Sequence, residues 1–579
     1  MTNHTFKSGE SREQSSLLPA RIEDYVGADN PVRAIDSFVC ALDLAKFGFR
    51  HADRGMEVGQ PPYDPADLLK LYLYGYINQI RSSRRLEREA CRNLELIWLL
   101  KNLKPGYRTI ANFRKENWKA LKAVNRGFVL LARELGLVGG TLVAIDGALF
   151  HGDASKASIF TRRRLAEQIA NLDKEIEAYG KSLEDNDATE AGQRTAGHGD
   201  GGGGLGADLG AKVTELMARR SRAQADLEGL DASNKRQLSL TDPDARLLSK
   251  GDQTIAGYNV QSVVDDKHML IVASEVINSS DAGHLHVMAR TAKEVLEAKS
   301  LQVLADTGYY SSADLKACED DGIEAYVPLF EGNGIPEKQG RFSRKDFSYD
   351  AAADVYRCPA GELLRPTEGR FTNTSGRAEI RYLGRKATCD TCQLKARCLS
   401  AKAPYRSINR WEHEDVLERH RARMQSEDAD KLMSRRSAIV EHPFGTLKCR
   451  AGYRHFLLRG FDKVRGEWSL MALCYNFTRV LNILGFERFI AAVAKAITCC
   501  LHALADALER LLLAPGPFWS RFAQQLVVAP RQTVCSANGW ILAQPRRGKS
   551  ALMICPSGQA NIIRRSRAGN VAGPSALIN

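Results

Sequence analysis

One short apolar run that contains a carboxylate constrains the fold of this chain more than any other feature. Residues 142–150 read LVAIDGALF, so four apolar residues lead into Asp146, and the chain becomes apolar again after Gly147. A continuous apolar run of this length is typical of a strand buried on both faces of a sheet. A carboxylate in such a strand is costly unless it is paired, hydrogen-bonded or bound to a metal. Taken alone, an Asp-Gly pair more often marks a turn between two strands.

The same pattern occurs again further along the chain, which favours a functional interpretation. Residues 302–308 read QVLADTG, a second apolar strand that ends in Asp306 and a glycine. Residues 438–448 read AIVEHPFGTLK and place Glu441 on a predicted helix. The sequence therefore offers three carboxylates, two of them on strands and one on a helix.

Three converging carboxylates cannot all stay ionised without compensating positive charge. Oxygen ligands of this kind suit Mg²⁺ or Mn²⁺. Two such ions, roughly 4 Å apart, can bind both the attacking and the leaving oxygen of an in-line phosphoryl displacement. We therefore predict that Asp146, Asp306 and Glu441 are catalytic metal ligands, with Asp146 shared between the two ions.

Lys448 follows Glu441 by seven residues, which corresponds to two turns of a regular helix. At that spacing it faces the same side as Glu441. We predict that it binds a DNA phosphate as a point charge. An exposed, solvated lysine is an equally good interpretation of the spacing alone.

The charge balance indicates a polyanionic partner. The net charge is +13 and the isoelectric point is near 9.1. No segment approaches the roughly 20 apolar residues of a membrane-spanning helix, so nucleic acid is favoured over a membrane surface. The first residues lack the basic-then-apolar layout of a signal peptide, and the thirteen cysteines are an odd number. We therefore expect an intracellular protein whose thiols are reduced.

Residues 17–139 carry helical signals and follow a polar segment, residues 1–16, that is predicted to be disordered. Short helices joined by tight turns, with basic residues at their starts, fit a DNA-binding domain of the helix-turn-helix kind. A solvated basic face without a partner is the alternative for either basic cluster alone. The side chains predicted to contact DNA are Arg81, Arg84, Arg85, Arg88, Arg114 and Lys115.

Residues 140–485 alternate strands and helices, which predicts an α/β catalytic domain. Two insertions interrupt it. Residues 160–235 have heptad spacing, which fits an antiparallel helical hairpin, our preferred interpretation, or a contact between two subunits. Residues 331–407 contain four cysteines. Beyond the domain we predict a helical C-terminal extension at 486–529 and a loosely ordered tail at 530–579.

The predicted order of elements is strand, hairpin, helix, strand, helix and strand, followed by the helix with Glu441. This order resembles the ribonuclease-H-like fold. In that fold an aspartate on the first strand and one on the fourth lie side by side at the sheet centre, and a helix supplies the third acid.

The cysteine-containing insertion includes a CxxC motif and two further cysteines in a basic context. This arrangement fits a small structural zinc knuckle. Reduced thiols without a metal fit it equally well. The candidate zinc ligands are Cys358, Cys389, Cys392 and Cys398.

Four segments together resemble the bacterial DDE-class insertion-sequence transposases, most closely the group called eleven-eighty-two. They read AIDGALF, VLADTGYYS, VEHPFGTLK and RGFDKVRGEWSLMALCYNFTRVLNIL, and the third is the most specific. The resemblance extends over residues 17–485. It implies an enzyme that binds the element's terminal inverted repeats, cuts there and joins the ends to target DNA. It also implies Asp146, Asp306 and Glu441 as the acidic triad, a homodimer at work on double-stranded DNA, and a nucleoid-associated location in a bacterial cytoplasm.

Related transposases carry a Tyr-x2-Arg-x3-Glu-x6-Lys signature around the glutamate. Glu441 and Lys448 match its last part, whereas Ser434 and Ser437 stand at its tyrosine and arginine positions. Arg436, one residue out of register, is our candidate for the phosphate contact of that arginine. Two alternatives stay open: a related metal-dependent DNA nuclease that cuts without joining, and a catalytically inactive, transposase-derived DNA-binding repressor. The presence of all three acids counts against the second.

Overall fold

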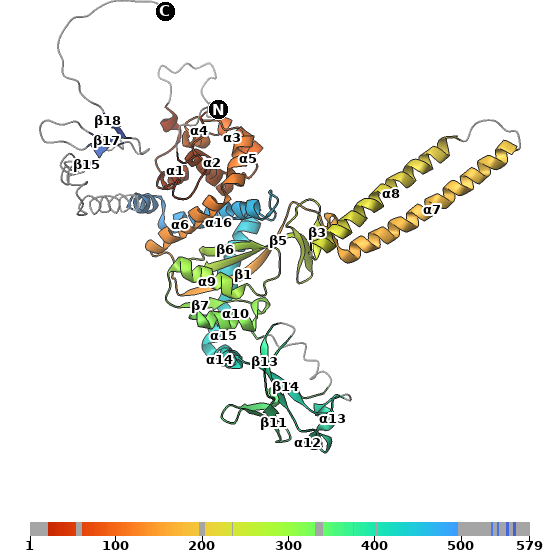
Figure 1. Cartoon of the computed structure of the whole chain (residues 1–579). Helices are drawn as coiled ribbons and strands as arrows, with labels where there is room; N and C mark the ends of the chain where they lie inside the picture. The colour runs from red at the N-terminus through yellow and green to blue at the C-terminus, as the bar shows by residue number, and fades with distance from the viewer. Residues whose placement is uncertain are drawn as a thin grey trace, which may run out of the picture. The chain divides into compact units, whose positions relative to one another are not determined.

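The computed structural model describes residues 21–53, 61–195, 203–233, 235–329, 340–373, 376–400 and 403–495, and four short strands after residue 533 (Figure 1). The chain divides into two units. The larger comprises Met1–Gly27 and Asp43–Gly485, and the smaller comprises Ala28–Leu42 and Phe486–Asn579. Within these described ranges, every helix falls short of the length and apolar character that a membrane span requires.

The N-terminal part of the larger unit is helical, as the sequence predicts. Its central helix begins where the Asp64 side chain accepts a hydrogen bond from the Ala66 amide at 2.8 Å, with Pro65 in the first turn. Proline suits this position because the first turn has no intrahelical partner for its missing N–H. The helices are η1 (Ile22–Tyr25), α2 (Pro65–Ile77), α3 (Ser83–Arg92), α4 (Leu94–Leu99), α5 (Tyr107–Glu116) and α6 (Trp118–Glu134).

A mixed sheet lies at the centre of the larger unit. Its strands run in the order β4-β5-β1-β7-β8, and β6 also pairs with β5. β1 is antiparallel to β5 and parallel to β7, and β7 is parallel to β8. Helices α9 (Leu285–Leu296) and α10 (Ser312–Asp320) connect the later strands. The strands are β1 (Leu142–His151), β4 (Arg246–Lys250), β5 (Gln253–Asp265), β6 (Ile271–Ile277), β7 (Leu301–Leu304) and β8 (Ile323–Tyr326).

Helix α16 (Phe461–Leu484) packs between this sheet and the N-terminal helices. The Trp468 indole N–H donates to the Ser274 hydroxyl at 2.8 Å, and the Asn476 amide bonds both backbone groups of Ile271 at 2.9 Å. The helix is buried on most of its faces, because α2 and α6 cover the side that points away from the strands.

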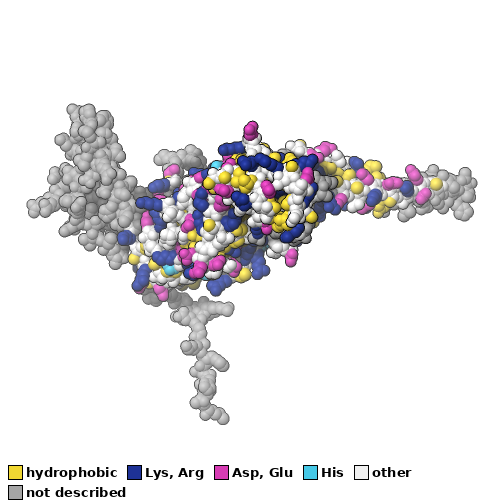
Figure 2. All heavy atoms as spheres, turned by 90° about the horizontal axis from the view of Figure 1, so that it is seen from below, with side chains coloured by type: hydrophobic (Ala, Val, Ile, Leu, Met, Phe, Trp, Pro, Cys, Tyr) yellow, Lys and Arg dark blue, Asp and Glu magenta, His cyan; other side chains and the backbone are white. Residues whose placement is uncertain are grey.

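The first insertion is a pair of long helices that pack side by side, α7 (Arg162–Thr195) and α8 (Gly203–Ala232) (Figure 1). The short strands β2 (Ile159–Thr161) and β3 (Gln237–Ser239) pair at its base. Its buried seam uses residues seven apart, so the heptad pattern is satisfied within one chain. Lys, Arg, Asp and Glu side chains alternate along its surface in Figure 2. The seam residues are Leu165 and Leu172 from α7, with Leu216, Ala223 and Leu230 from α8.

The second insertion has a small sheet of its own, in the order β12-β13-β11-β10-β9, with β14 paired to β13. Its core consists of Phe347, Tyr356, Leu364, Tyr382 and Ile408. The sheet continues through Trp411, the last residue of β14. The elements are η4 (Arg344–Asp346), β9 (Ser348–Asp350), β10 (Val355–Arg357), β11 (Leu363–Pro366), β12 (Phe371–Thr372), β13 (Ala378–Leu383), α12 (Lys386–Asp390), α13 (Lys395–Cys398) and β14 (Ser407–Trp411).

The chain then returns to the central sheet through α14 (Glu414–Met424) and α15 (Glu427–Gly445). A π-helix, Thr446–Arg450, follows α15 directly. Helix α15 packs against β1, β5 and β7.

The smaller unit contains α1 (Pro31–Cys40) and a helical segment at residues 486–495. Four short strands pair in antiparallel order; they are β15 (Val534–Cys535), β16 (Ile541–Leu542), β17 (Leu552–Ile554) and β18 (Ala560–Ile562). The predictions for residues 1–16, for most of 486–529 and for the rest of 530–579 lie outside the described residues.

Candidate active site

Asp146 lies on β1, and Asp306 follows the end of the neighbouring parallel strand β7, where it caps the short helix η3 (Thr307–Tyr309). The register pairs Ala144 of β1 with Leu304 of β7, and each aspartate comes two residues after its member of this pair. Because side chains alternate along a strand, the two carboxylates are placed at the same level of the sheet. Asp146 accepts a hydrogen bond from the Gly147 amide at 2.8 Å, and Asp306 accepts one from the Gly308 amide at 2.9 Å.

A lysine that the sequence patterns did not mark lies between these carboxylates. The Lys250 ammonium is 3.1 Å from Asp146 Oδ1 and 4.0 Å from Asp306 Oδ2, and it donates to the Gly147 carbonyl at 2.7 Å. Lys250 is the last residue of β4. No local sequence pattern identifies Lys250, because only the pairing of β4 with β5 brings its side chain to these carboxylates.

Asp281 is a third carboxylate at the same position, also missed from the sequence. Its Oδ2 lies 3.7 Å from the Lys250 ammonium. Its Oδ1 accepts hydrogen bonds from the side-chain amides of Asn259 at 2.8 Å and Gln261 at 2.7 Å. Asp281 lies in the connection between β6 and α9, where a polar residue is ordinary. Asp281 can be identified only from the pairing of three strands. β5 lies between β1 and β6, and its residues Asn259 and Gln261 donate to the Asp281 carboxylate.

The electrostatics of the cluster follow from this geometry. Burial raises the pKa of Asp306 above its ordinary value, and the carboxylates of Asp146 and Asp281 add to the rise, while Lys250 and Arg436 oppose it. Burial acts to lower the pKa of Lys250, but the three carboxylates outweigh it and raise that pKa. The site therefore holds a charged ammonium among several carboxylates, as expected where like charges are crowded.

Glu441 is exposed on α15, and no hydrogen bond or ion pair joins it to Asp146 or Asp306 in the described structure. The structure thus brings together two of the three predicted acids, with Asp281 as a neighbour. Glu441 shares their surroundings only through the packing of α15 on β1 and β7.

Lys448 lies in the π-helix that follows α15, so the assumption of a regular helix from Glu441 to Lys448 is wrong. A π-helical stretch shifts the direction of the residues after it, and such stretches are frequent at functional sites. The Lys448 ammonium donates to the Leu149 carbonyl at 2.9 Å and lies 4.6 Å from the centre of the Phe150 ring. Its burial and the nearby Lys250 lower its pKa. It therefore lies against β1, close to the acids.

Arg436 is close enough to Asp306 to lower the pKa of that carboxyl. Its Nη1 atom is buried without a hydrogen-bond partner. The preceding Arg435 instead forms an ion pair with Asp266 at 2.8 Å. Of these two adjacent arginines, Arg436 is therefore the one whose charge acts on Asp306.

Two of the arginines predicted to contact DNA are engaged inside the protein. Arg114 is buried, donates to the Tyr76 hydroxyl at 2.7 Å and lies 3.9 Å from Glu467. Arg81 donates to the His455 carbonyl at 2.7 Å and lies 3.7 Å from the same carboxylate. Both connect the N-terminal helices to the region of α16, so we remove them from the predicted DNA-binding surface. The remaining four side chains, Arg84, Arg85, Arg88 and Lys115, are exposed.

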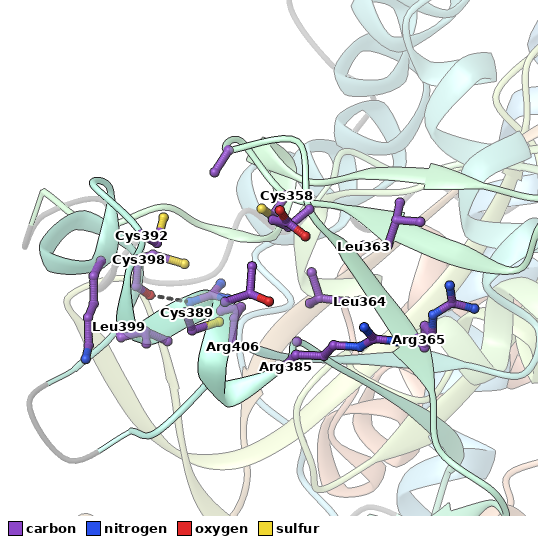
Figure 3. Close-up of a pocket in the computed structure, with 15 residues that line it drawn as sticks. Cys358, Leu363, Leu364, Arg365, Arg385, Cys389, Cys392, Cys398, Leu399 and Arg406 are labelled. Carbon is purple, nitrogen blue, oxygen red and sulfur yellow. Dashed lines mark hydrogen bonds between the residues drawn. The ribbon is translucent and has the colours of Figure 1, made fainter.

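The four candidate zinc ligands line one pocket of the second insertion. Figure 3 shows Cys389, Cys392 and Cys398 on one side of it and Cys358 beside Leu363, with Arg406 donating to the Cys398 carbonyl at 3.1 Å. In the described part of the chain, however, no group of three or more His, Cys, Asp or Glu side chains is arranged to hold a metal ion. The structure therefore does not support the zinc prediction. The same finding covers the described carboxylates around Asp146 and Asp306, among which the Lys250 ammonium lies.

Two protein-family models match the chain. A transposase DDE domain matches residues 357–481, which include Arg436, Glu441 and Lys448. A transposase domain (DUF772) matches residues 20–116, which include helices α2 to α5. Asp146 and Asp306 lie outside both matches. No curated protein matches the chain.

The two matches cover separate parts of the chain, and together they indicate a DDE-type transposase of an insertion sequence, a mobile element that moves by DNA transposition. Proteins of this class act on DNA, and divalent metal ions are their general requirement.

Proposed function

We propose that this transposase binds the terminal inverted repeats of its own insertion sequence, cuts DNA there and joins the ends to target DNA. The observation that carries the proposal is the position of Asp146, on β1, and Asp306, just after the parallel strand β7, with both carboxylates near the Lys250 ammonium. The order of the sheet supports a ribonuclease-H-like core, since β1 is flanked by antiparallel β5 and by parallel β7. We assign Asp146, Asp306 and Glu441 as its acidic triad.

The donor chemistry of the cluster fits a hard divalent cation, because carboxylate oxygens are preferred ligands of Mg²⁺ and Mn²⁺. Asp146 and Asp306 would hold the ions, and Glu441 completes the set from α15, which packs on both of their strands. When bound, two such ions activate the attacking oxygen and stabilise the leaving oxygen.

Basic side chains around the acids have the chemistry to hold the DNA backbone. Arg436 has an unpartnered buried Nη1 and lowers the pKa of Asp306 by its charge, and Lys448 lies against β1. A guanidinium suits a phosphate because its N–H groups match two phosphate oxygens, whereas an ammonium binds as a point charge. We propose that both position the scissile phosphate at Asp146 and Asp306.

The basic face of α3, with Lys115 of α5, is proposed as the end-binding surface. Arg84, Arg85 and Arg88 follow one another on one short helix, and Arg84 lies over the Tyr107 ring at 5.4 Å. Phosphate contacts of this kind orient a helical domain on duplex DNA. The working complex is proposed to be a homodimer, because two element ends must be brought together.

The test is cleavage and strand transfer on labelled DNA that carries the segments flanking this coding sequence, in Mg²⁺ or Mn²⁺. Asp146→Asn is expected to abolish both reactions while end binding persists. Asp153→Asn is the matched control, because Asp153 follows the same strand but pairs with Arg459 on the surface at 2.7 Å. Cleavage without joining would favour the nuclease, and specific binding without cleavage by the wild type would favour the repressor.

A further inference from the structure

We propose that Lys250 is a built-in counter-ion of the catalytic carboxylates, which divalent metal must displace before the site can act. This inference rests on the proposed function above, because it assumes that Asp146 and Asp306 bind the metal. It assigns a positioning and gating role to a residue on a hairpin that neither matched family domain includes.

The ammonium occupies the place toward which the acids converge. Its four nearest oxygen partners come from Gly147 at 2.7 Å, Asp146 at 3.1 Å, Asp281 at 3.7 Å and Asp306 at 4.0 Å. An ammonium has three N–H donors and no acceptor, so it can satisfy several of these oxygens at once. The carboxylate oxygens among them are those that a metal ion would need at about 2.0–2.1 Å for Mg²⁺.

A lysine and a divalent ion cannot share this position. Like charges a few ångströms apart repel each other, and a divalent ion doubles the repulsion that a unit charge would exert on the ammonium. The charges that face the ammonium are the carboxylates of Asp146, Asp281 and Asp306 and the like charge of Lys448. Metal binding therefore requires that the Lys250 side chain leave the cluster.

The position of Lys250 in the fold makes such a departure inexpensive. Pairing of β5 with β1 ends at Gly257, whereas pairing of β5 with β4 continues to the Lys250–Gln253 pair. The end of the hairpin is thus a two-stranded ribbon, and such ribbons are only marginally stable alone. The Lys250 side chain is 45% exposed, and its flexible four-carbon stem lets the ammonium move into solvent. Gly251 forms the adjoining turn with φ +59°.

The ammonium has two consequences for the enzyme. Without metal, it neutralises part of the charge of three carboxylates and keeps them together. With metal, the displaced ammonium stays within side-chain reach of the site, where a DNA phosphate would pair with it.

The first test measures Mn²⁺ binding to the full-length protein without DNA, by titration followed through the electron paramagnetic resonance signal of free Mn²⁺. Lys250→Met should bind Mn²⁺ at least about tenfold more tightly than the wild type, since no ammonium competes. Lys250→Arg should not bind more tightly. Lys316→Met is the matched control, because Lys316 also pairs with carboxylate oxygens, of Asp320, but contacts none of the three aspartates. Equal or weaker binding by Lys250→Met would overturn the inference.

The second test uses the wild type alone, so it does not depend on the folding of a variant. Lysine acetylation followed by mass spectrometry should show faster labelling of Lys250 when Mg²⁺ is added, with labelling of Lys316 unchanged. Labelling of Lys250 that does not respond to Mg²⁺ would contradict displacement.

Asp146→Asn separates this inference from the proposed function. If this variant loses Mn²⁺ while Lys250→Met binds as the wild type does, only the role of Lys250 fails. If Asp146→Asn binds Mn²⁺ as the wild type does, the metal site itself is misassigned and both proposals fail.

Discussion

Asp281 Oδ1 lies so close to Gly147 that a Cβ atom on that glycine would stand only 2.1 Å from it. The same Cβ would be 2.5 Å from Gln261 Nε2 and 2.8 Å from Asn259 Oδ1. Gly147 is therefore required by close approach, because any side chain there would push apart the amides and the carboxylate beside Asp146.

Gly147→Ala should accordingly disturb the acidic cluster. Overpacking of this kind costs about 1–3 kcal/mol of stability, and we expect DNA cleavage to fall more than about tenfold because Asp281 and the Lys250 contacts move. Gly180→Ala is the control, since a Cβ at Gly180 on α7 meets open space. Thermal unfolding and end cleavage measured together would test this. If Gly147→Ala cleaved DNA as fast as the wild type does, the position of Asp281 would be shown not to matter for cleavage.

The buried pair of Arg114 and Glu467 is predicted to stabilise the junction between the N-terminal helices and α16. The Glu467 side chain is fully buried and also accepts hydrogen bonds from the amides of Leu457 and Leu458. Arg114→Met leaves that carboxylate without its guanidinium partner on α5, which should cost about 3–5 kcal/mol. Chemical unfolding measures the loss, and Arg114→Met combined with Glu467→Gln should recover part of it. An unchanged unfolding midpoint would mean that Arg81 alone is enough to compensate the charge of the buried Glu467 carboxylate.

The basic face of α3 predicts a different phenotype. Replacing Arg84, Arg85 and Arg88 with Ala should weaken binding to the element ends with little effect on stability, because none of the three is buried. The slope of log affinity against log salt concentration should become shallower by about 0.9 for each phosphate that the protein no longer neutralises. Arg163→Ala provides the control, because Arg163 is exposed on α7 of the helical insertion and pairs with Glu167. An unaltered salt slope in the triple variant would place the DNA-binding surface elsewhere.

His420 is predicted to make the protein less stable in mild acid. It is buried on α14, its Nε2 bonds the Val327 carbonyl at 2.9 Å, and burial lowers its pKa below the ordinary value near 6.5. As the pH falls below the ordinary histidine pKa near 6.5, the unfolded chain binds a proton at His420 before the folded protein does. The free energy of unfolding therefore decreases as the pH falls toward the lower pKa of the folded protein.

Unfolding midpoints in urea, compared between neutral and mildly acidic buffer on either side of the ordinary histidine pKa, would measure this effect. His420→Gln should reduce the difference between the two midpoints, whereas His413→Gln, at an exposed position, should leave it unchanged. Part of the difference should remain, because burial lowers the pKa of His442 and His455 as well. A midpoint difference that is the same in His420→Gln and the wild type would exclude His420 as the cause.

The elements around the site could be predicted from the sequence where one local pattern sufficed. The apolar runs before Asp146 and Asp306 correspond to β1 and β7, and the two strands are neighbours. Asp281 and Lys250 could not be found in this way, because their place depends on strand register and on the pairing of a hairpin.

The sequence-based predictions for Arg114 and Lys448 were wrong for the same reason, namely that the outcome depends on distant segments. Arg114 lies in a basic stretch that looks solvated, but Glu467 is 353 residues away in the sequence and pairs with it in the folded interior (467 − 114). Lys448 follows Glu441 at helical spacing, but a π-helix begins between them. Spacing describes one segment at a time, and both outcomes depend on how distant segments pack together.

The most direct test of the central claim is end cleavage in Mn²⁺ by the wild type and by Glu441→Gln. Glu427→Gln, at the exposed start of the same helix, is the matched control. The acidic triad predicts that Glu441→Gln binds the element ends as the wild type does but does not cut them, while Glu427→Gln cuts normally. Equal cutting by Glu441→Gln and the wild type would contradict the assignment of Glu441 and leave Asp146 and Asp306 without their proposed third partner.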